Sequence, residues 1–169
     1  MKDGFLNVLK PPGMTSHDVV SFVRRIVGVK KAGHAGTLDP GAAGVLPVAV
    51  GRAARLLEYL NAVDKSYRAE LRFGMATDSG DDLGEIVDSR TDFAMPDGAA
   101  LAAAVQGMMG RIRQTPPLYS AVKIGGRRAC DLVRANIPIT LASREVEVYR
   151  LEVLAQATQI GRASCRERV

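Results

Sequence analysis

The chain has 169 residues, of which 47% are hydrophobic and 24% are charged, and this composition suits one globular domain with a hydrophobic core. The net charge of +5 is compatible with a polyanionic partner without indicating one, and the longest apolar stretch, residues 42–50, is too short to cross a bilayer. No secretory signal is visible and the two cysteines stand alone, which predicts a protein of the reducing cytoplasm and argues against a disulfide framework or a zinc site.

A strand, a turn and a capped helix are predicted for the first 28 residues. The apolar run of residues 5–9 ends at the sequence KPPG of residues 10–13, which favours a rigid turn. Thr15 and Ser16 then offer N-cap hydroxyls, and Gly28 can end the helix that follows. One face of this helix is apolar and should point into the core: Val19, Val20, Val23, Ile26 and Val27.

A glycine-rich loop, a buried strand and a second helix are predicted next. The loop runs from Gly33 to Gly44. Residues 45–50 have the apolar run of a buried strand, although Pro47 would need an edge position or a bulge. Leucines at positions 56, 57 and 60 indicate a short helix.

The remainder of the chain predicts further strands and one more helix. Apolar and charged residues alternate over residues 67–73, the period of a strand with one wet face, and residues 77–84 form an acidic loop expected in solvent. Asp97 can cap a helix that ends near Gly110, and residues 146–153 indicate a strand pair or a bulged strand. No βαβ unit repeats, so we expect an α+β fold with a mixed, largely antiparallel sheet flanked by helices.

The last twelve residues differ from the rest. From Thr158 onward the alternation of a strand is lost, and the apolar residues are too few for a core helix. We therefore expect a catalytic domain over residues 1–157 and an unrelated tail over residues 158–169.

The densest group of candidate functional residues is the sequence GHAGTLDPGAAG of residues 33–44. Its four glycines permit positive φ or the close approach of another group. It lacks the ending of a phosphate-binding P-loop and the spacing of a dinucleotide-binding turn. By residue type alone, Asp39-Pro40-Gly41 is an ordinary turn and His34 is a loop or core histidine.

Four blocks of the chain resemble the motifs of TruB-type tRNA pseudouridine synthases, in the family order. Residues 10–16 match K-P-x-G-x-T-S, and residues 33–47 match G-H-x-G-T-L-D-P-x-A-x-G-x-L-P. Residues 64–67 resemble D-K-x-Y, and residues 116–123 resemble P-P-x-Y-S-A-x-K. The match over residues 33–47 is long and specific, so it outweighs the interpretation as a simple turn. The resemblance implies the pseudouridine synthase catalytic fold.

The resemblance also implies an activity, the conversion of the T-loop uridine of tRNA (position 55) to pseudouridine. Asp39 would be the catalytic carboxylate, and an aspartate is ionised at neutral pH unless it is strongly perturbed. It would act either as a nucleophile on the uracil ring or on ribose C1′, or as a base that removes a proton from C2′ to give a glycal. The family uses neither a metal nor a redox cofactor.

Further residues acquire roles through the same resemblance. Tyr67 would stack on the target base, and His34 would occupy the space that the flipped base vacates. The basic stretch of residues 111–134 would contact the T-arm of tRNA, through Lys123, Arg127 and Arg128. Lys10, Thr15 and Ser16 are expected to have structural roles around the site.

One departure from the family keeps a second hypothesis open. Family members continue past residue 154 into a segment that supplies an arginine partner for the catalytic aspartate and a second pocket aromatic, and no such motif follows here. The fold is then expected to be incomplete at its C-terminus. The protein is expected to be a monomer. The alternative to an enzyme is a non-catalytic tRNA-binding or folding module, or an inactive fragment.

Overall fold

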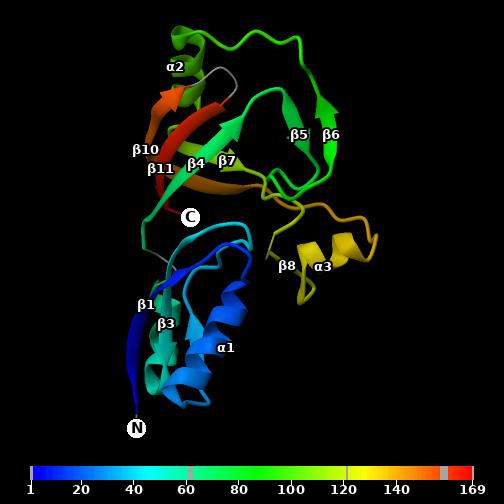
Figure 1. Ribbon diagram of the computed structural model, residues 1–169. Helices are drawn as coiled ribbons and strands as arrows, with labels where there is room; N and C mark the ends of the chain where they lie inside the picture. Colours follow the sequence, from blue (N-terminus) through cyan, green and yellow to red (C-terminus); the bar gives the residue numbers. More distant parts are fainter. Residues whose placement is uncertain (1, 61–62, 121, 157–159, 169) are drawn as a thin grey trace. The chain divides into compact units, whose positions relative to one another are not determined.

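The structure is a computed structural model that describes residues 2–60, 63–120, 122–156 and 160–168. The chain divides into two compact units, Met1–Val63 and Asp64–Val169 (Figure 1). The sequence predicted one domain over residues 1–157. Two units form because the described strands of each unit pair only with strands of the same unit. Among the described residues, no helix is long and apolar enough to cross a membrane.

A three-stranded antiparallel sheet forms the first unit. Its order is β1 (Gly4–Lys10), β3 (Gly44–Val50) and β2 (Ala32–His34). The register places Gly4 opposite Val50 at one end of the sheet and Lys10 opposite Gly44 at the other. Pro47 is tolerated in the central strand because it lies just beyond the last residue that β2 pairs, where its carbonyl accepts a hydrogen bond from the Ala35 N–H at 3.0 Å.

The helix α1 (Ser16–Val27) covers this sheet and has the predicted caps. The Thr15 hydroxyl accepts a hydrogen bond from the Asp18 N–H at 3.1 Å, and the Asp18 carboxylate accepts one from the Thr15 N–H at 2.9 Å, which completes a capping box. Gly28 ends the helix in the left-handed conformation at φ 71°.

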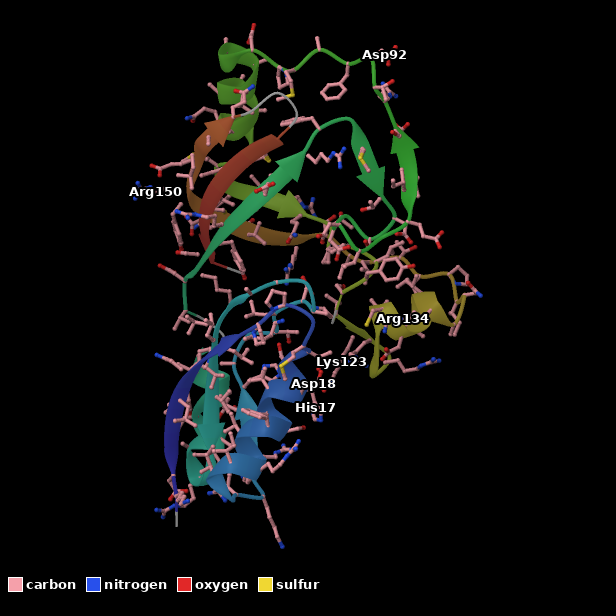
Figure 2. The ribbon with its side chains drawn as sticks, in the orientation of Figure 1. His17, Asp18, Asp92, Lys123, Arg134 and Arg150 are labelled. Carbon is pink, nitrogen blue, oxygen red and sulfur yellow. The ribbon has the colours of Figure 1, made fainter. Side chains whose placement is uncertain are left out.

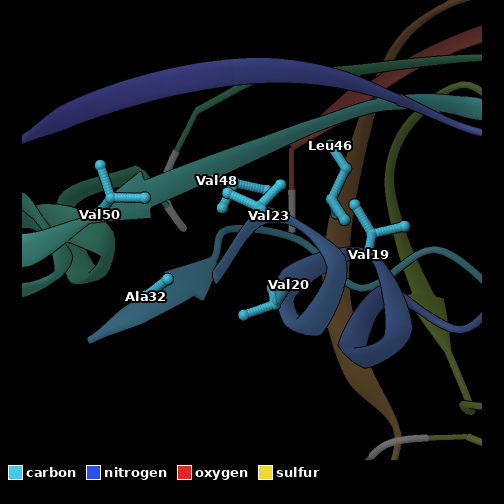
Figure 3. Close-up of a cluster of buried hydrophobic side chains, with 7 residues drawn as sticks. All are labelled: Val19, Val20, Val23, Ala32, Leu46, Val48 and Val50. Carbon is cyan, nitrogen blue, oxygen red and sulfur yellow. The ribbon is translucent and has the colours of Figure 1, made fainter. Parts of the chain in front are cut away.

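The core of the first unit lies between α1 and the sheet (Figure 3). Each fully buried valine contributes roughly 1.5–3 kcal/mol to folding, so this small cluster supplies much of the unit's stability. Ile26, predicted for the same face, is instead 67% exposed. The second predicted helix is the 3-10 helix η1 (Gly51–Leu60). The cluster consists of Val19, Val20, Val23, Ala32, Leu46, Val48 and Val50.

A four-stranded antiparallel sheet dominates the second unit. Its order is β4 (Lys65–Arg72), β11 (Ile160–Arg168), β10 (Arg144–Gln156) and β7 (Gly110–Gln114). The prediction of a bulged strand over residues 146–153 is confirmed, because the register of β10 shifts twice along its pairing with β11. The prediction that β4 has one wet face is wrong, since Tyr67 and Leu71 on its apolar face are 44% and 52% exposed.

Smaller elements complete the second unit. The hairpin of β5 (Met75–Thr77) and β6 (Ile86–Ser89) encloses the acidic loop, whose aspartates are exposed as predicted. The helix α2 (Gly98–Gly107) is capped by Asp97 as predicted, but it ends before Gly110, which opens β7. The short hairpin of β8 (Lys123–Ile124) and β9 (Arg127–Arg128) leads into α3 (Ala129–Arg134).

The last residues correct the prediction made for them. Residues 160–168 form β11 between β4 and β10, so the expected loss of strand structure after Thr158 is wrong for that range. Residues 157–159 and 169 lie outside the described part. The side-chain pattern missed this strand because backbone pairing on both sides can outweigh weak alternation. The α+β class with antiparallel pairing is confirmed, although the strands form four sheets and not one.

Candidate active site

Asp39 lies on a turn between β2 and β3, at the end of the first unit where Lys10 pairs with Gly44. The Ala42 N–H donates a hydrogen bond to the Asp39 carbonyl at 3.0 Å, which closes the turn that Asp39-Pro40-Gly41 predicted. The side chain of Asp39 is exposed. The loop therefore presents a carboxylate that a substrate can reach.

Lys10 fixes the residue that follows Asp39. Its side chain is 0% exposed, and its ammonium donates hydrogen bonds to the carbonyls of Pro11 at 3.0 Å, Met14 at 2.7 Å and Pro40 at 3.2 Å. A buried ammonium is tolerated only when its donors are satisfied, and three carbonyls match its three N–H groups. The Gly13 N–H donates to the same Pro40 carbonyl at 2.8 Å. The first family motif thus holds the second through Pro40.

Ser16 fixes the residue that precedes Asp39. Its hydroxyl accepts a hydrogen bond from the Leu38 N–H at 3.0 Å and donates one to the Leu38 carbonyl at 3.2 Å. Ser16 is 3% exposed, so water does not compete for these bonds. The backbone is therefore held on both sides of Asp39 while its side chain stays accessible. The structural roles predicted for Lys10, Thr15 and Ser16 are seen in these contacts.

His34 lies on β2 in the same unit, opposite Val48. Its side chain is partly buried, and its Nδ1 is a buried atom without a hydrogen-bond partner among the described residues. Buried polar atoms are nearly always bonded, so this nitrogen is an exception that a bound group could satisfy. His34 and Asp39 belong to the same unit, but the loop predicted from Gly33 begins only after His34, because Gly33 and His34 pair with β3 as part of β2.

Tyr67 and the basic residues belong to the second unit. Tyr67 lies on β4, where it pairs with Cys165 of β11. Lys123 pairs with Arg128 across the β8–β9 hairpin, whose turn is made by Gly125 and Gly126, both at positive φ (Lys123 is labelled in Figure 2). The two glycines allow the tight turn that exposes the basic side chains on either strand.

The three predicted RNA contacts differ in their surroundings. Arg128 donates two hydrogen bonds to the Asp131 carboxylate, at 2.8 and 3.1 Å. Hydrogen bonding by this guanidinium lowers the pKa of Asp131 below its usual value. Lys123 and Arg127 are exposed, and their side chains have no hydrogen bond or ion pair with the described residues. Their charges are therefore more available to a phosphate than that of Arg128.

One contact in the second unit escaped the sequence analysis. The Tyr119 hydroxyl donates a hydrogen bond to the Asp78 carboxylate at 3.3 Å, and the charge of Asp78 is the main cause that raises the pKa of Tyr119. This bond links the PPLYSAVK motif to the acidic loop. Forty-one residues separate the two partners, so no local pattern could have indicated the pair.

A family model described as TruB family pseudouridylate synthase (N terminal domain) matches residues 24–167 of the chain. The chain belongs to this family. The match covers the Asp39 loop, Tyr67 and the β8–β9 hairpin, so the resemblance drawn from four short blocks is confirmed. It also runs into β11, and the interpretation of residues 158–169 as a tail foreign to the TruB family stays a prediction.

Curated relatives agree with the TruB assignment. The chain is 55% identical over 152 residues to tRNA pseudouridine synthase B of Symbiobacterium thermophilum, which covers 90% of this chain and 50% of that protein. It is 47% identical over 152 residues to the protein of the same name from Alkaliphilus oremlandii, again with 90% and 50% coverage. The chain thus spans about half the length of the curated relatives it matches.

Solved structures confirm the fold. A chain in the crystal structure of a Cbf5-Nop10-Gar1 complex is similar with a TM-score of 0.70 and 30% identity, over 98% of this chain and 40% of that one. A chain in the structure of an H/ACA RNP bound to a substrate RNA containing 2′-deoxyuridine is similar with a TM-score of 0.66 and 26% identity, over 98% of this chain and 38% of that one.

Proposed function

We propose that this TruB-family chain takes part in the isomerisation of the T-loop uridine of tRNA (position 55) to pseudouridine, with Asp39 as the catalytic carboxylate. The observation that carries the proposal is the exposed carboxylate on a turn whose neighbours on both sides, Leu38 and Pro40, are hydrogen-bonded to the first motif. Such anchoring keeps a reacting group close to one geometry, and misplacement by about 1 Å can cost two orders of magnitude in rate.

The proposed reaction breaks the bond between uracil N1 and ribose C1′ and forms one between C5 and C1′. The proton on C5 is lost and N1 gains a proton, so the product is an isomer and neither a metal nor a redox cofactor is required. Asp39 assists either by adding to the uracil ring or to C1′ as a nucleophile, or by removing the C2′ proton to form a glycal. An accessible carboxylate suits each of these routes.

The remaining predicted residues complete the proposal. Tyr67 stacks on the flipped uracil, and His34, whose Nδ1 is unpaired among the described residues, lies where the base leaves its stack. Lys123, Arg127 and Arg128 contact T-arm phosphates from the β8–β9 hairpin. We propose that the protein acts as a monomer in the cytoplasm.

A second function, RNA binding without catalysis, is favoured by a different observation. Asp39 has no ion pair with any described residue. A carboxylate without a cationic partner in its pocket is less well oriented for reaction. In this second function the basic β8–β9 hairpin binds tRNA without turnover.

Nucleoside mass spectrometry on a T-arm stem-loop distinguishes the two functions. The chain is incubated with the RNA, and an RNA with cytidine at the target position is the substrate control. Pseudouridine that forms in the first RNA and disappears with the Asp39→Ala variant supports the enzyme. Binding of the RNA by the wild-type chain without any product supports the binding module and contradicts the proposed activity.

A further inference from the structure

A basic hollow lies at the end of the first unit where β1 begins and α1 ends. It has a volume of about 530 Å³, and its lining includes Gly28 and Gly51, both at positive φ. A Cβ on Gly51 would collide with the Asp3 carboxylate and the Lys2 carbonyl, so only glycine lets the chain pass there. The charged residues that line it are Lys2, Asp3, Lys30, Lys31, Arg52 and Arg55.

The hollow carries the whole net charge of its unit. Residues 1–63 contain eight lysines and arginines against four aspartates and glutamates, a net +4 out of the +5 of the chain. Five of these cations and one acid line the hollow, which is also a net +4. The remaining three cations and three acids of the unit cancel. The positive potential is therefore concentrated at this end of the unit and not spread over it.

The chain holds part of this charge in place and leaves part of it available. Asp3 accepts hydrogen bonds from the Arg52 N–H at 2.6 Å and from Arg52 Nε at 2.8 Å, and Lys2 donates to the Val27 carbonyl at 2.9 Å. Lys30, Lys31 and Arg55 are exposed and have no hydrogen bond or ion pair through their side chains within the described residues. The Asp3 carboxylate is therefore paired with Arg52, whereas the three exposed cations are available to bind a ligand.

The hollow is well separated from the Asp39 loop. Asp39 lies at the end of the sheet where Lys10 pairs with Gly44, whereas the hollow lies where Gly4 pairs with Val50 (the end marked N in Figure 1). Seven residues of β1 span about 20 Å between these ends. A ligand in the hollow therefore cannot be the target nucleotide itself.

We propose that the hollow binds backbone phosphates of the substrate RNA, at a point about 20 Å from the target uridine. Ammonium and guanidinium groups without competing acids are the groups that bind phosphodiesters, and an RNA long enough to place a uridine at Asp39 can reach both ends of the unit. The proposal rests on the proposed function, because it takes the RNA at Asp39 as the ligand. It adds a phosphate site outside the β8–β9 hairpin, in the unit that holds Asp39.

The test compares two variants that remove the same charge. The hollow variant is Lys30→Gln, Lys31→Gln and Arg55→Gln, all exposed side chains away from the core. The control variant is Arg25→Gln, Arg90→Gln and Arg150→Gln, exposed residues that do not line the hollow. The dissociation constant of a tRNA transcript is measured for the wild-type chain and for each variant at several salt concentrations, together with pseudouridine formation at saturating RNA.

We expect the hollow variant to bind tRNA at least about tenfold more weakly than the wild type. The slope of its log Kd against log salt concentration should be smaller than that of the wild type by about 2–3. The control variant should retain most of the wild-type slope. Equal slopes of log Kd against log salt concentration for the two variants, or a wild-type chain that binds no tRNA, would contradict the proposal that the hollow binds RNA phosphates. If pseudouridine forms but the two variants have equal slopes, the proposed function is supported and the phosphate site in the hollow is refuted. If the slopes differ as expected but no pseudouridine forms, the phosphate site is supported and the catalytic role is refuted.

Discussion

At the scale of single residues, two buried side chains fix the backbone on either side of Asp39. Lys10 and Ser16 are almost fully buried, and each bonds the backbone of a residue next to Asp39. The sequence indicated the turn itself, because aspartate, proline and glycine each favour it locally. The bonds across 22 and 30 residues could not be derived from spacing. They depend on how α1 and the sheet pack.

Replacement of Ser16 by alanine should separate positioning from folding. The change removes both bonds to Leu38 and leaves a partly buried N–H and carbonyl without these partners, which costs about 1–3 kcal/mol of stability. We expect the rate at saturating RNA to fall about tenfold or more with little change in RNA affinity, because the carboxylate moves while the binding surface remains. Single-turnover kinetics and urea unfolding measure the two effects. Ser21→Ala on the same helix is the matched control, and an equal loss for both variants would contradict the positioning role.

The cap of α1 should make stability depend on pH in the acidic range. Hydrogen bonds from the Thr15 hydroxyl and N–H lower the pKa of Asp18 below its ordinary value of 3.8. The folded state therefore binds this proton less readily than the unfolded state, so the stabilisation is complete above about pH 5 and is lost as the pH falls through the lowered pKa. Urea midpoints measured as the pH is lowered should fall more steeply for the wild type than for Asp18→Asn. Parallel curves would show that the cap does not contribute.

At the scale of elements, the elements that depend on local sequence signals are predicted correctly, whereas those that depend on pairing between distant strands are not. The sequence predicts both ends of α1 because Thr15 and Gly28 act within one turn of the positions they cap. The division into four sheets and the strand β11 depend on partners far away in sequence. The helical period assigns Ile26 to the core, but its side chain is 67% exposed, because the period alone does not tell how far the neighbouring sheet extends.

The β8–β9 hairpin predicts an order among its basic residues. Lys123→Gln and Arg127→Gln should each weaken tRNA binding and lower the salt dependence of log Kd by about 1, because these charges are free to meet phosphates. Arg128→Gln should have a smaller effect on binding, since two hydrogen bonds already hold its guanidinium on Asp131. Affinity titrations across a salt series check the order. A larger effect for Arg128 than for the other two would show that RNA displaces Asp131.

At the scale of the whole molecule, most of the net charge and the candidate catalytic carboxylate lie in the first unit. That unit supplies Asp39, His34, the two anchoring residues and four of the five net positive charges, while the second unit supplies Tyr67 and the basic hairpin. The weak basic excess noted from composition is therefore stronger locally than the total suggests. The chain spans about half of its TruB relatives, so its own capacity for turnover is the central question.

Release of tritium from C5 of the target uridine answers that question most directly, because this proton leaves only when the base is rejoined through C5. The measurement is a single-turnover time course on T-arm RNA with the wild-type chain, Asp39→Asn and Asp82→Asn, an exposed aspartate of the acidic loop. We predict release by the wild type and Asp82→Asn, and a loss of about a hundredfold or more for Asp39→Asn with unchanged RNA affinity. Equal release by Asp39→Asn, or RNA binding by the wild type without release, would contradict the assignment of Asp39.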